Sequence, residues 1–82
     1  MQKKGLKFMY SYNINVALGN VLRKYREGRK LTQEEFAELC GISRAYYGRA
    51  ERGEHSLTIE TCQRIADALN IRIVDLFTEL PE

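Results

Sequence analysis

Apolar residues recur at helical spacing along most of this chain of 82 residues. Leu18, Leu22 and Tyr25 predict a helix from about Val16 to Arg29, because positions three or four apart share one face of a helix. Later apolar stripes predict helices over about 33–40, 44–52, 59–69 and 73–79. In the fourth helix the expected buried stripe is Ile59, Cys62, Ile65, Ala66 and Leu69. Five helices with short connections predict a compact all-α fold.

Polar and glycine residues mark the expected ends of these helices. Thr32 and Glu35 match a capping box, in which each side chain accepts a hydrogen bond from the other residue's backbone, and a helix then begins directly after Thr32. Gly41 suits the left-handed conformation that ends a helix, and Ser43 is a typical residue to begin the next one. Gly53 is the expected terminator of that helix.

The segment 32–53 therefore predicts two short amphipathic helices joined by a tight turn, a helix-turn-helix spanning 33–52. Apolar residues lie where two steeply crossing helices must touch: Phe36, Ala37, Cys40, Ile42, Tyr47 and Ala50. The free face of the second helix is expected to carry Arg44, Ala45, Gly48, Arg49 and Arg52. Arginine binds guanine edges and phosphates through paired hydrogen bonds, and glycine permits close approach to another surface. This face is predicted to enter the major groove of DNA.

Gln33 begins the first helix of this pair. The backbone N–H groups there are free and the helix dipole is positive, so a phosphate oxygen is one expected partner. The alternative is an ordinary glutamine in the capping region.

Charge is distributed unevenly along the chain, although its net value is only +2. Residues 1–53 hold eleven of the thirteen Lys and Arg residues but only five of the eleven acidic ones. This half is predicted to face a polyanion, and the acidic half to serve another purpose. Residues 1–14 are assigned to an N-terminal arm or extension and 15–80 to the helical domain. The arm has three readings: a frayed terminus, a short strand that packs or pairs, or a basic segment laid along DNA.

Several classes of site are not expected from this sequence. Cys40 and Cys62 have no C-x-x-C neighbour and occupy apolar positions, so we expect buried, reduced thiols. His55 is the only histidine and has no evident metal-binding neighbours. No nucleophile–base pair suggests an enzyme. We expect no metal, cofactor, small-molecule effector or membrane span, and a cytoplasmic protein.

The combined pattern resembles the phage-repressor/Cro-type helix-turn-helix family, also called the XRE family, over about residues 16–80. The matching residues include Leu18-Gly19, Tyr25-Arg26, Leu31-Thr32-Gln33-Glu34-Glu35-Phe36-Ala37, Gly41-Ile42-Ser43, Glu51-Arg52-Gly53, Ile65-Ala66 and Leu76-Phe77. The resemblance implies a five-helix, lambda-repressor-like domain that binds operator DNA as a dimer. Two residues depart from it: Tyr47 stands where a β-branched aliphatic residue is usual, and Ala50 stands where a larger aliphatic residue is usual.

The resemblance also implies roles for individual residues. Arg44, Ala45 and Arg49 would face base edges, together with Gly48 on the same face. The expected phosphate-binding residues are Gln33, Ser43, Tyr46, Arg52, His55 and Ser56. Arg26 and Glu51 match an ion pair that braces the first helix against the third.

The sequence therefore predicts a sequence-specific, double-stranded-DNA-binding transcriptional regulator, such as a small repressor or a restriction–modification controller. A homodimer is expected, with its interface in the acidic half at Ile73, Leu76, Phe77 and Leu80. The alternative is an antitoxin-type module that neutralises a partner protein and binds DNA secondarily.

Overall fold

Short polar caps and apolar stripes produce a fold built from α-helices. The computed structural model describes residues 13–81, and the expectations for the N-terminal arm fall mainly on residues 1–12, outside that range. Within residues 13–81 the elements are five helices and no strands, which confirms the predicted all-α class. They are α2 (Ile14–Gly28), α3 (Gln33–Cys40), α4 (Arg44–Glu51), α5 (Ile59–Leu69) and α6 (Ile73–Thr78).

Side-chain caps begin most of these helices. The oxygens that accept hydrogen bonds from the first turns belong to Asn13, Thr32, Ser43 and Thr58. The predicted capping box forms: Thr32 Oγ1 accepts a hydrogen bond from Glu35 N at 3.0 Å, and Glu35 Oε1 accepts one from Thr32 N at 2.9 Å. Gly41 ends α3 in the left-handed conformation, at φ 73°. Local chemistry thus accounts for the boundaries of the helix-turn-helix.

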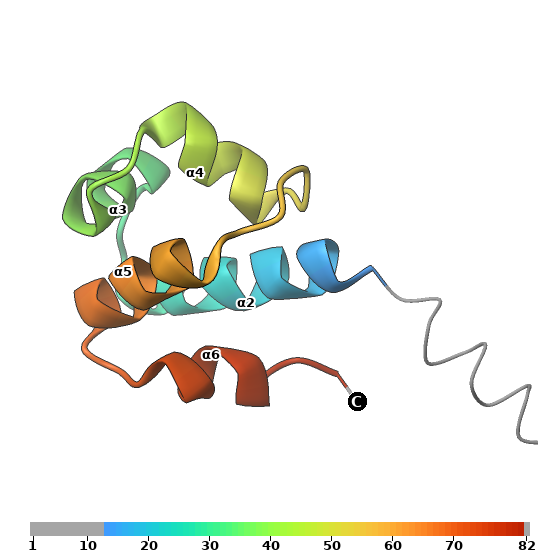
Figure 1. Cartoon of the computed structure of the whole chain (residues 1–82). Helices are drawn as coiled ribbons and strands as arrows, with labels where there is room; N and C mark the ends of the chain where they lie inside the picture. Colours follow the sequence, from blue (N-terminus) through green and yellow to red (C-terminus); the bar gives the residue numbers. More distant parts are fainter. Residues whose placement is uncertain (1–12, 82) are drawn as a thin grey trace, which may run out of the picture.

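Helices α2 and α5 lie between α3 and α4 on one side and α6 on the other (Figure 1). Helices α3 and α4 make up the helix-turn-helix, with α4 against α2 and α3 against α5. Helix α6 packs against α2 and α5, on the side of the molecule opposite α4 (Figure 1). The surface of α4 and the surface of α6 therefore point away from each other.

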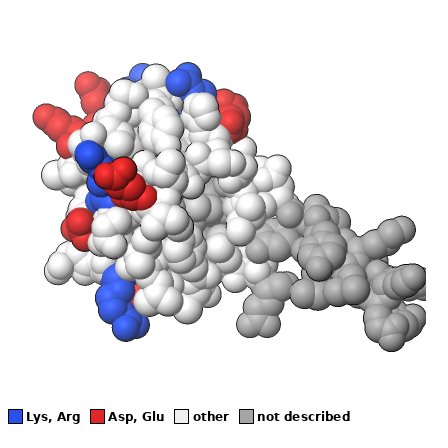
Figure 2. All heavy atoms as spheres, viewed as in Figure 1, with Lys and Arg blue, Asp and Glu red and all other residues white. Residues whose placement is uncertain are grey.

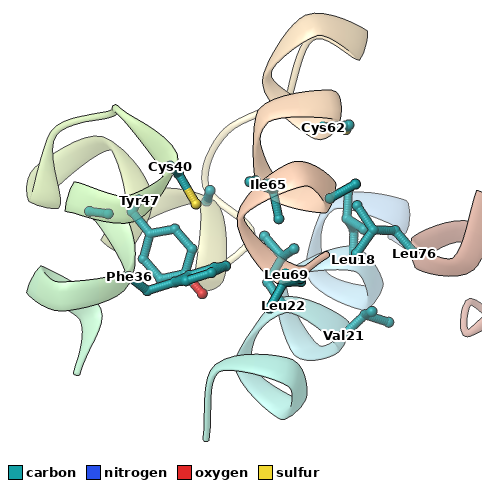
Figure 3. Packing of buried hydrophobic residues seen from close by; sticks show 13 residues of the cluster. Leu18, Val21, Leu22, Phe36, Cys40, Tyr47, Cys62, Ile65, Leu69 and Leu76 are labelled. Carbon is teal, nitrogen blue, oxygen red and sulfur yellow. The ribbon is translucent and has the colours of Figure 1, made fainter. Parts of the chain in front are cut away.

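Large apolar side chains from all five helices fill the core (Figure 3). Phe36 of α3 and Tyr47 of α4 meet edge to face, with ring centroids 5.2 Å apart. Leu22, Ile65 and Leu69 join α2 to α5 and are almost completely buried. The predicted contact between the two helices of the helix-turn-helix is confirmed, because five of its six apolar residues are buried and Ile42 is half-buried.

Two predictions about apolar residues are wrong. Ile59 is 70% exposed, because it is the first residue of α5 and precedes the part of the helix that enters the core. Leu76 is completely buried, so it cannot contribute to a dimer surface. The apolar face of the short helix α6 closes the core instead, and Ile73, Phe77 and Leu80 pack partly buried against it.

Gly19 allows α2 and α4 to come into backbone contact. A Cβ atom at this position would lie 2.8 Å from the carbonyl oxygen of Ala50 and closer still to that of Glu51. These neighbours are backbone atoms at the end of α4, which cannot rotate away as a side chain can. The distance between the two helices is therefore set by the absence of a side chain at residue 19.

Replacing Gly19 by alanine is expected to reduce the free energy of unfolding by about 3 kcal/mol or more, because the added methyl group must push α4 off α2. Urea unfolding followed by circular dichroism measures the loss. Gly28→Ala is the matched control: no atom lies within 4 Å of its added Cβ, and a change of less than about 1 kcal/mol is expected. Equal stabilities for the two variants would contradict this account of the contact.

Candidate nucleic-acid interface

One side of α4 is open to solvent at the edge of the molecule (Figure 1). Its arginines Arg44 and Arg49 are exposed, as are Ala45 between them and Arg52 directly after the helix. Figure 2 shows Lys and Arg groups projecting at this edge, with acidic groups on either side of them. The helix-turn-helix thus presents the arginines predicted from the sequence, within a surface of mixed charge.

Gly48 departs from the prediction that it lies on the open face. It is buried, and a Cβ atom there would lie 3.3 Å from a terminal nitrogen of Arg52 and 3.5 Å from Oε1 of Gln33. Those two side chains cover the glycine. The close approach that Gly48 permits is an approach by neighbouring side chains of the same chain.

A buried carboxylate, that of Glu51, lies at the inner end of α4. Arg26 of α2 donates two hydrogen bonds to it, from Nε at 2.8 Å and from a terminal nitrogen at 3.0 Å. Tyr47 Oη donates at 2.6 Å and Gln33 Nε2 at 2.8 Å. The side chains of Arg26 and Glu51 are only 12% and 5% exposed. The predicted ion pair therefore forms, and it belongs to a larger network.

This network determines the charge state of its members. Burial would raise the pKa of Glu51, but hydrogen bonds from Arg26, Tyr47 and Gln33 outweigh it, and the pKa is lowered below the usual value. Burial, followed by the hydrogen bond to Glu51, raises the pKa of Tyr47. At neutral pH the carboxylate is thus ionised and the tyrosine hydroxyl remains its donor.

Gln33 connects this buried network to the surface. It is the first residue of α3 and is half-buried, with its side-chain nitrogen donating to Glu51 and its side-chain oxygen lying beside Gly48. The sequence left open whether this residue is a phosphate ligand or an ordinary residue of the capping region. The side-chain amide of Gln33 is held in place by its hydrogen bond to Glu51. A residue whose role is limited to capping the helix does not need such a contact.

The loop after α4 brings Arg49, His55 and Tyr46 together. Arg49 Nε donates a hydrogen bond to His55 Nε2 at 2.9 Å. The imidazole of His55 stacks on the ring of Tyr46, with centroids 5.3 Å apart and planes 30° apart. Two residues predicted to bind phosphate are therefore packed against each other and against a predicted base-contacting arginine.

The remaining expected phosphate ligands also have partners within the protein. Arg52 forms an ion pair with Glu54 at 3.0 Å, and both side chains are more than half exposed. Ser56 Oγ accepts a hydrogen bond from Asn15 Nδ2 at 3.1 Å, which ties the loop to the start of α2. Ser43 Oγ is occupied as the cap of α4 and accepts from Tyr46 N at 3.0 Å.

Three residues of this region had no role assigned from the sequence. They are Asn15, Glu54 and, for its hydroxyl group, Tyr47. The charge pair of Arg52 with an acidic residue two positions later could have suggested Glu54. Asn15 lies 41 positions from Ser56, and the sequence holds no signal for that pairing.

Among residues 13–81 no group of three or more His, Cys, Asp or Glu side chains is placed to hold a metal ion. In the same range, no helix combines the length and apolar character needed to cross a membrane. Both cysteines are free thiols in the core, and burial raises the pKa of Cys40 to about 11.

The chain is similar to known helix-turn-helix proteins. The helix-turn-helix family model matches residues 22–76. Control protein C.SmaI of Serratia marcescens is 38% identical over 66 residues, which cover 80% of this chain and 79% of that protein. Control protein C.MunI of Mycoplasma sp is 32% identical over 69 residues, covering 83% and 93%.

A solved structure also resembles this fold closely. The crystal structure of the restriction-modification controller protein C.AhdI from Aeromonas hydrophila superposes with a TM-score of 0.77 at 36% identity. The match covers 80% of this chain and all of that one. The similarity therefore extends over the helices that carry the arginine face and the Glu51 network.

Replacing Glu51 by glutamine is expected to reduce the free energy of unfolding by about 3–5 kcal/mol, because the buried guanidinium of Arg26 loses its counter-charge. The wild type should also lose stability as the pH falls below about 4, since a carboxylate with a lowered pKa stabilises the fold only while ionised. That part of the pH dependence should be absent from the variant. Urea unfolding at several pH values between 2 and 7 measures both effects.

Glu38→Gln, at an exposed position of α3, is the matched control and should behave as the wild type. A Glu51→Gln protein that is as stable as the wild type but no longer binds DNA would contradict the structural assignment and make Glu51 a functional residue.

Proposed function

Because this chain belongs to the helix-turn-helix family and is a DNA-binding transcriptional regulator, we propose that it binds a specific operator as a homodimer, as restriction–modification controllers or small repressors would. The observation that carries this proposal is the exposed arginine face of α4. The other side of this helix packs against α2 and α3. The protein acts by occupancy: when bound, it blocks or recruits polymerase and does no chemistry on DNA.

The controller role is favoured over the antitoxin alternative by the extent of the similarity. This chain spans most of the length of the two control proteins and the whole of the controller structure described above. An antitoxin would also need a surface for its partner protein, and no described residue points specifically to one.

Base recognition is assigned to Arg49, Arg44 and Ala45. All three lie on the open side of α4. A guanidinium can donate two parallel hydrogen bonds to guanine O6 and N7, and the alanine methyl group suits an apolar contact such as the thymine methyl. Gly48 is removed from this group because it is covered by Gln33 and Arg52.

Phosphate contacts are assigned to the residues at the rims of α3 and α4. Gln33 lies at the N-terminus of α3, where free N–H groups and the helix dipole favour an anion. Arg52, His55 and Ser56 follow the C-terminal end of α4. Tyr46 lies in the first turn of α4, with its ring stacked on His55, and Ser43 caps the same helix. Such contacts orient the protein on DNA, and base contacts select the sequence.

Dimerisation is assigned to α6 and its flanks. This helix lies on the side opposite α4 (Figure 1), so a seam there leaves both recognition helices free. Val74 is 44% exposed, and Ile73, Phe77 and Leu80 are partly buried beside it. Two recognition helices must be separated by about 34 Å to enter successive major grooves, which a twofold axis along this face can provide.

Selection from a random duplex DNA library with the full-length protein is the test of the proposed function, and one palindromic or near-palindromic sequence should be enriched. With about four phosphate contacts per subunit, the logarithm of affinity should fall with the logarithm of salt concentration at a slope near −7.

Replacing Arg49 by alanine should reduce the binding free energy by about 1–3 kcal/mol per half-site and relax the preference at one base pair.

Arg23→Ala, which removes an exposed arginine from α2, is the matched control and should leave sequence preference intact. A salt slope flatter than about −3, or a library in which no sequence is enriched, would contradict the proposed function. Equal loss by Arg49→Ala on every sequence would make this residue a phosphate contact.

The dimer is expected to be present at tens of micromolar in the absence of DNA, as sedimentation equilibrium would show. Replacing Val74 by aspartate should shift the protein toward monomer, because two copies of the charge would face each other across a twofold seam. Leu39→Asp is the matched control, since Leu39 is 60% exposed but lies on α3. A monomeric wild type, or a dimer unaffected by Val74→Asp, would exclude this seam.

A further inference from the structure

The guanidinium of Arg49 is held at its Nε atom by the loop that follows the helix on which Arg49 lies. Its Nε atom donates to His55 Nε2 at 2.9 Å, across six residues of sequence. An imidazole nitrogen that accepts a hydrogen bond carries no proton, so the proton of the neutral ring resides on Nδ1. With Nε occupied, the two terminal nitrogens of Arg49 are the donors left to bind a ligand.

His55 is itself fixed from two directions. Its ring stacks on Tyr46, one turn before Arg49 on the same helix. The loop on which it lies turns back at Gly53, whose φ is 78°, and Glu54 N donates to Arg49 O at 2.8 Å. The next residue, Ser56, is tied to Asn15 of α2. The imidazole is therefore a rigid acceptor with a defined position relative to α4.

The hydrogen bond to His55 is the one that the Arg49 side chain makes within residues 13–81. The neighbouring carboxylate, Glu54, is paired with Arg52 instead, at 3.0 Å. Without the hydrogen bond to His55, the long Arg49 side chain keeps its full rotamer freedom on the exposed side of α4.

We propose that His55 is a positioning residue for base recognition: its neutral imidazole holds the Arg49 guanidinium with both terminal nitrogens directed outward. This inference rests on the proposed function and assigns to His55 a role different from the phosphate contact implied by the family resemblance. A long, flexible side chain loses rotamer freedom when it binds a base, and an arginine already held at Nε loses less of it. The benefit appears only at the base pair that Arg49 contacts.

Two substitutions separate the acceptor from the ring. His55→Phe retains an aromatic ring to stack on Tyr46 but has no acceptor for Arg49 Nε. His55→Gln loses the ring but offers a side-chain oxygen as acceptor. If positioning through the hydrogen bond is the role of His55, the glutamine variant keeps sequence preference and the phenylalanine variant loses it.

The probes are the duplex enriched from a random library by the full-length wild-type protein and single-base variants of that duplex. His55→Phe should weaken binding to the enriched duplex by about three- to tenfold per half-site. The loss should be confined to the base pair whose preference Arg49→Ala also abolishes. In the Arg49→Ala background, His55→Phe should have no further effect, and the salt slope should equal that of Arg49→Ala alone.

A measurement without DNA provides a second readout. In ¹H–¹⁵N spectra the Arg49 Nε–H of the wild type and of His55→Gln should give a distinct, slowly exchanging signal, which His55→Phe should abolish. Thermal unfolding of each variant establishes that it is folded. Both DNA-free results would support the hydrogen bond, and an unchanged signal in His55→Phe would overturn it.

The outcomes distinguish this inference from the function on which it rests. If His55→Phe weakens binding equally on all duplexes, reduces the salt slope by about one and adds to Arg49→Ala, His55 contacts phosphate and the positioning role is overturned. No effect of His55→Phe overturns it as well. If the library yields no enriched sequence, the proposed function fails and the positioning role fails with it.

Discussion

The arrangement of the helix-turn-helix depends on one ionised carboxylate that is almost completely buried. A charge in that position is unfavourable unless donors surround it, and Glu51 receives four hydrogen bonds. Its donors come from α2, α3 and α4, so the carboxylate is satisfied only when these helices adopt one relative arrangement. Apolar contacts are non-directional, whereas these hydrogen bonds require defined positions of their donors on the three helices.

A second constraint, which also comes from α2, acts on the same end of α4. The backbone of α2 at Gly19 meets the backbone of α4 at Ala50 and Glu51. The residue that carries the buried charge therefore also lies where the backbones of two helices are in contact. Because Gln33 binds the same carboxylate and covers Gly48, the geometry of the interior extends to the surface that we propose contacts DNA.

Local signals predicted the helix boundaries well, because a cap or a glycine acts within a few residues of itself. Thr32, Gly41 and Ser43 are examples, and the Arg26–Glu51 pair followed from the family resemblance. Predictions failed where burial depends on a distant element. Gly48 is covered by a side chain from α3, and Leu76 is covered by α2 and α5. Helical periodicity shows which residues share a face but not what covers that face.

The loop contacts were beyond sequence reasoning for a related reason. His55 reaches Arg49 because the chain reverses at Gly53 with a positive φ, and Ser56 reaches Asn15 because that turn brings the loop to the start of α2. Each contact joins positions that share no periodic pattern. Only the folded path of the backbone makes them neighbours.

The pairing of Arg49 with His55 has a consequence for the evolution and engineering of operator preference. Arg44 and Ala45 are exposed at the start of α4, and exchanging them leaves the core and the Glu51 network untouched. Arg49 is different, because its replacement also removes the hydrogen-bond donor of His55, whose ring is stacked on Tyr46. If these residues contact bases as we propose, a change of preference at Arg44 or Ala45 requires a single substitution, whereas a change at Arg49 requires residues 49 and 55 to change together.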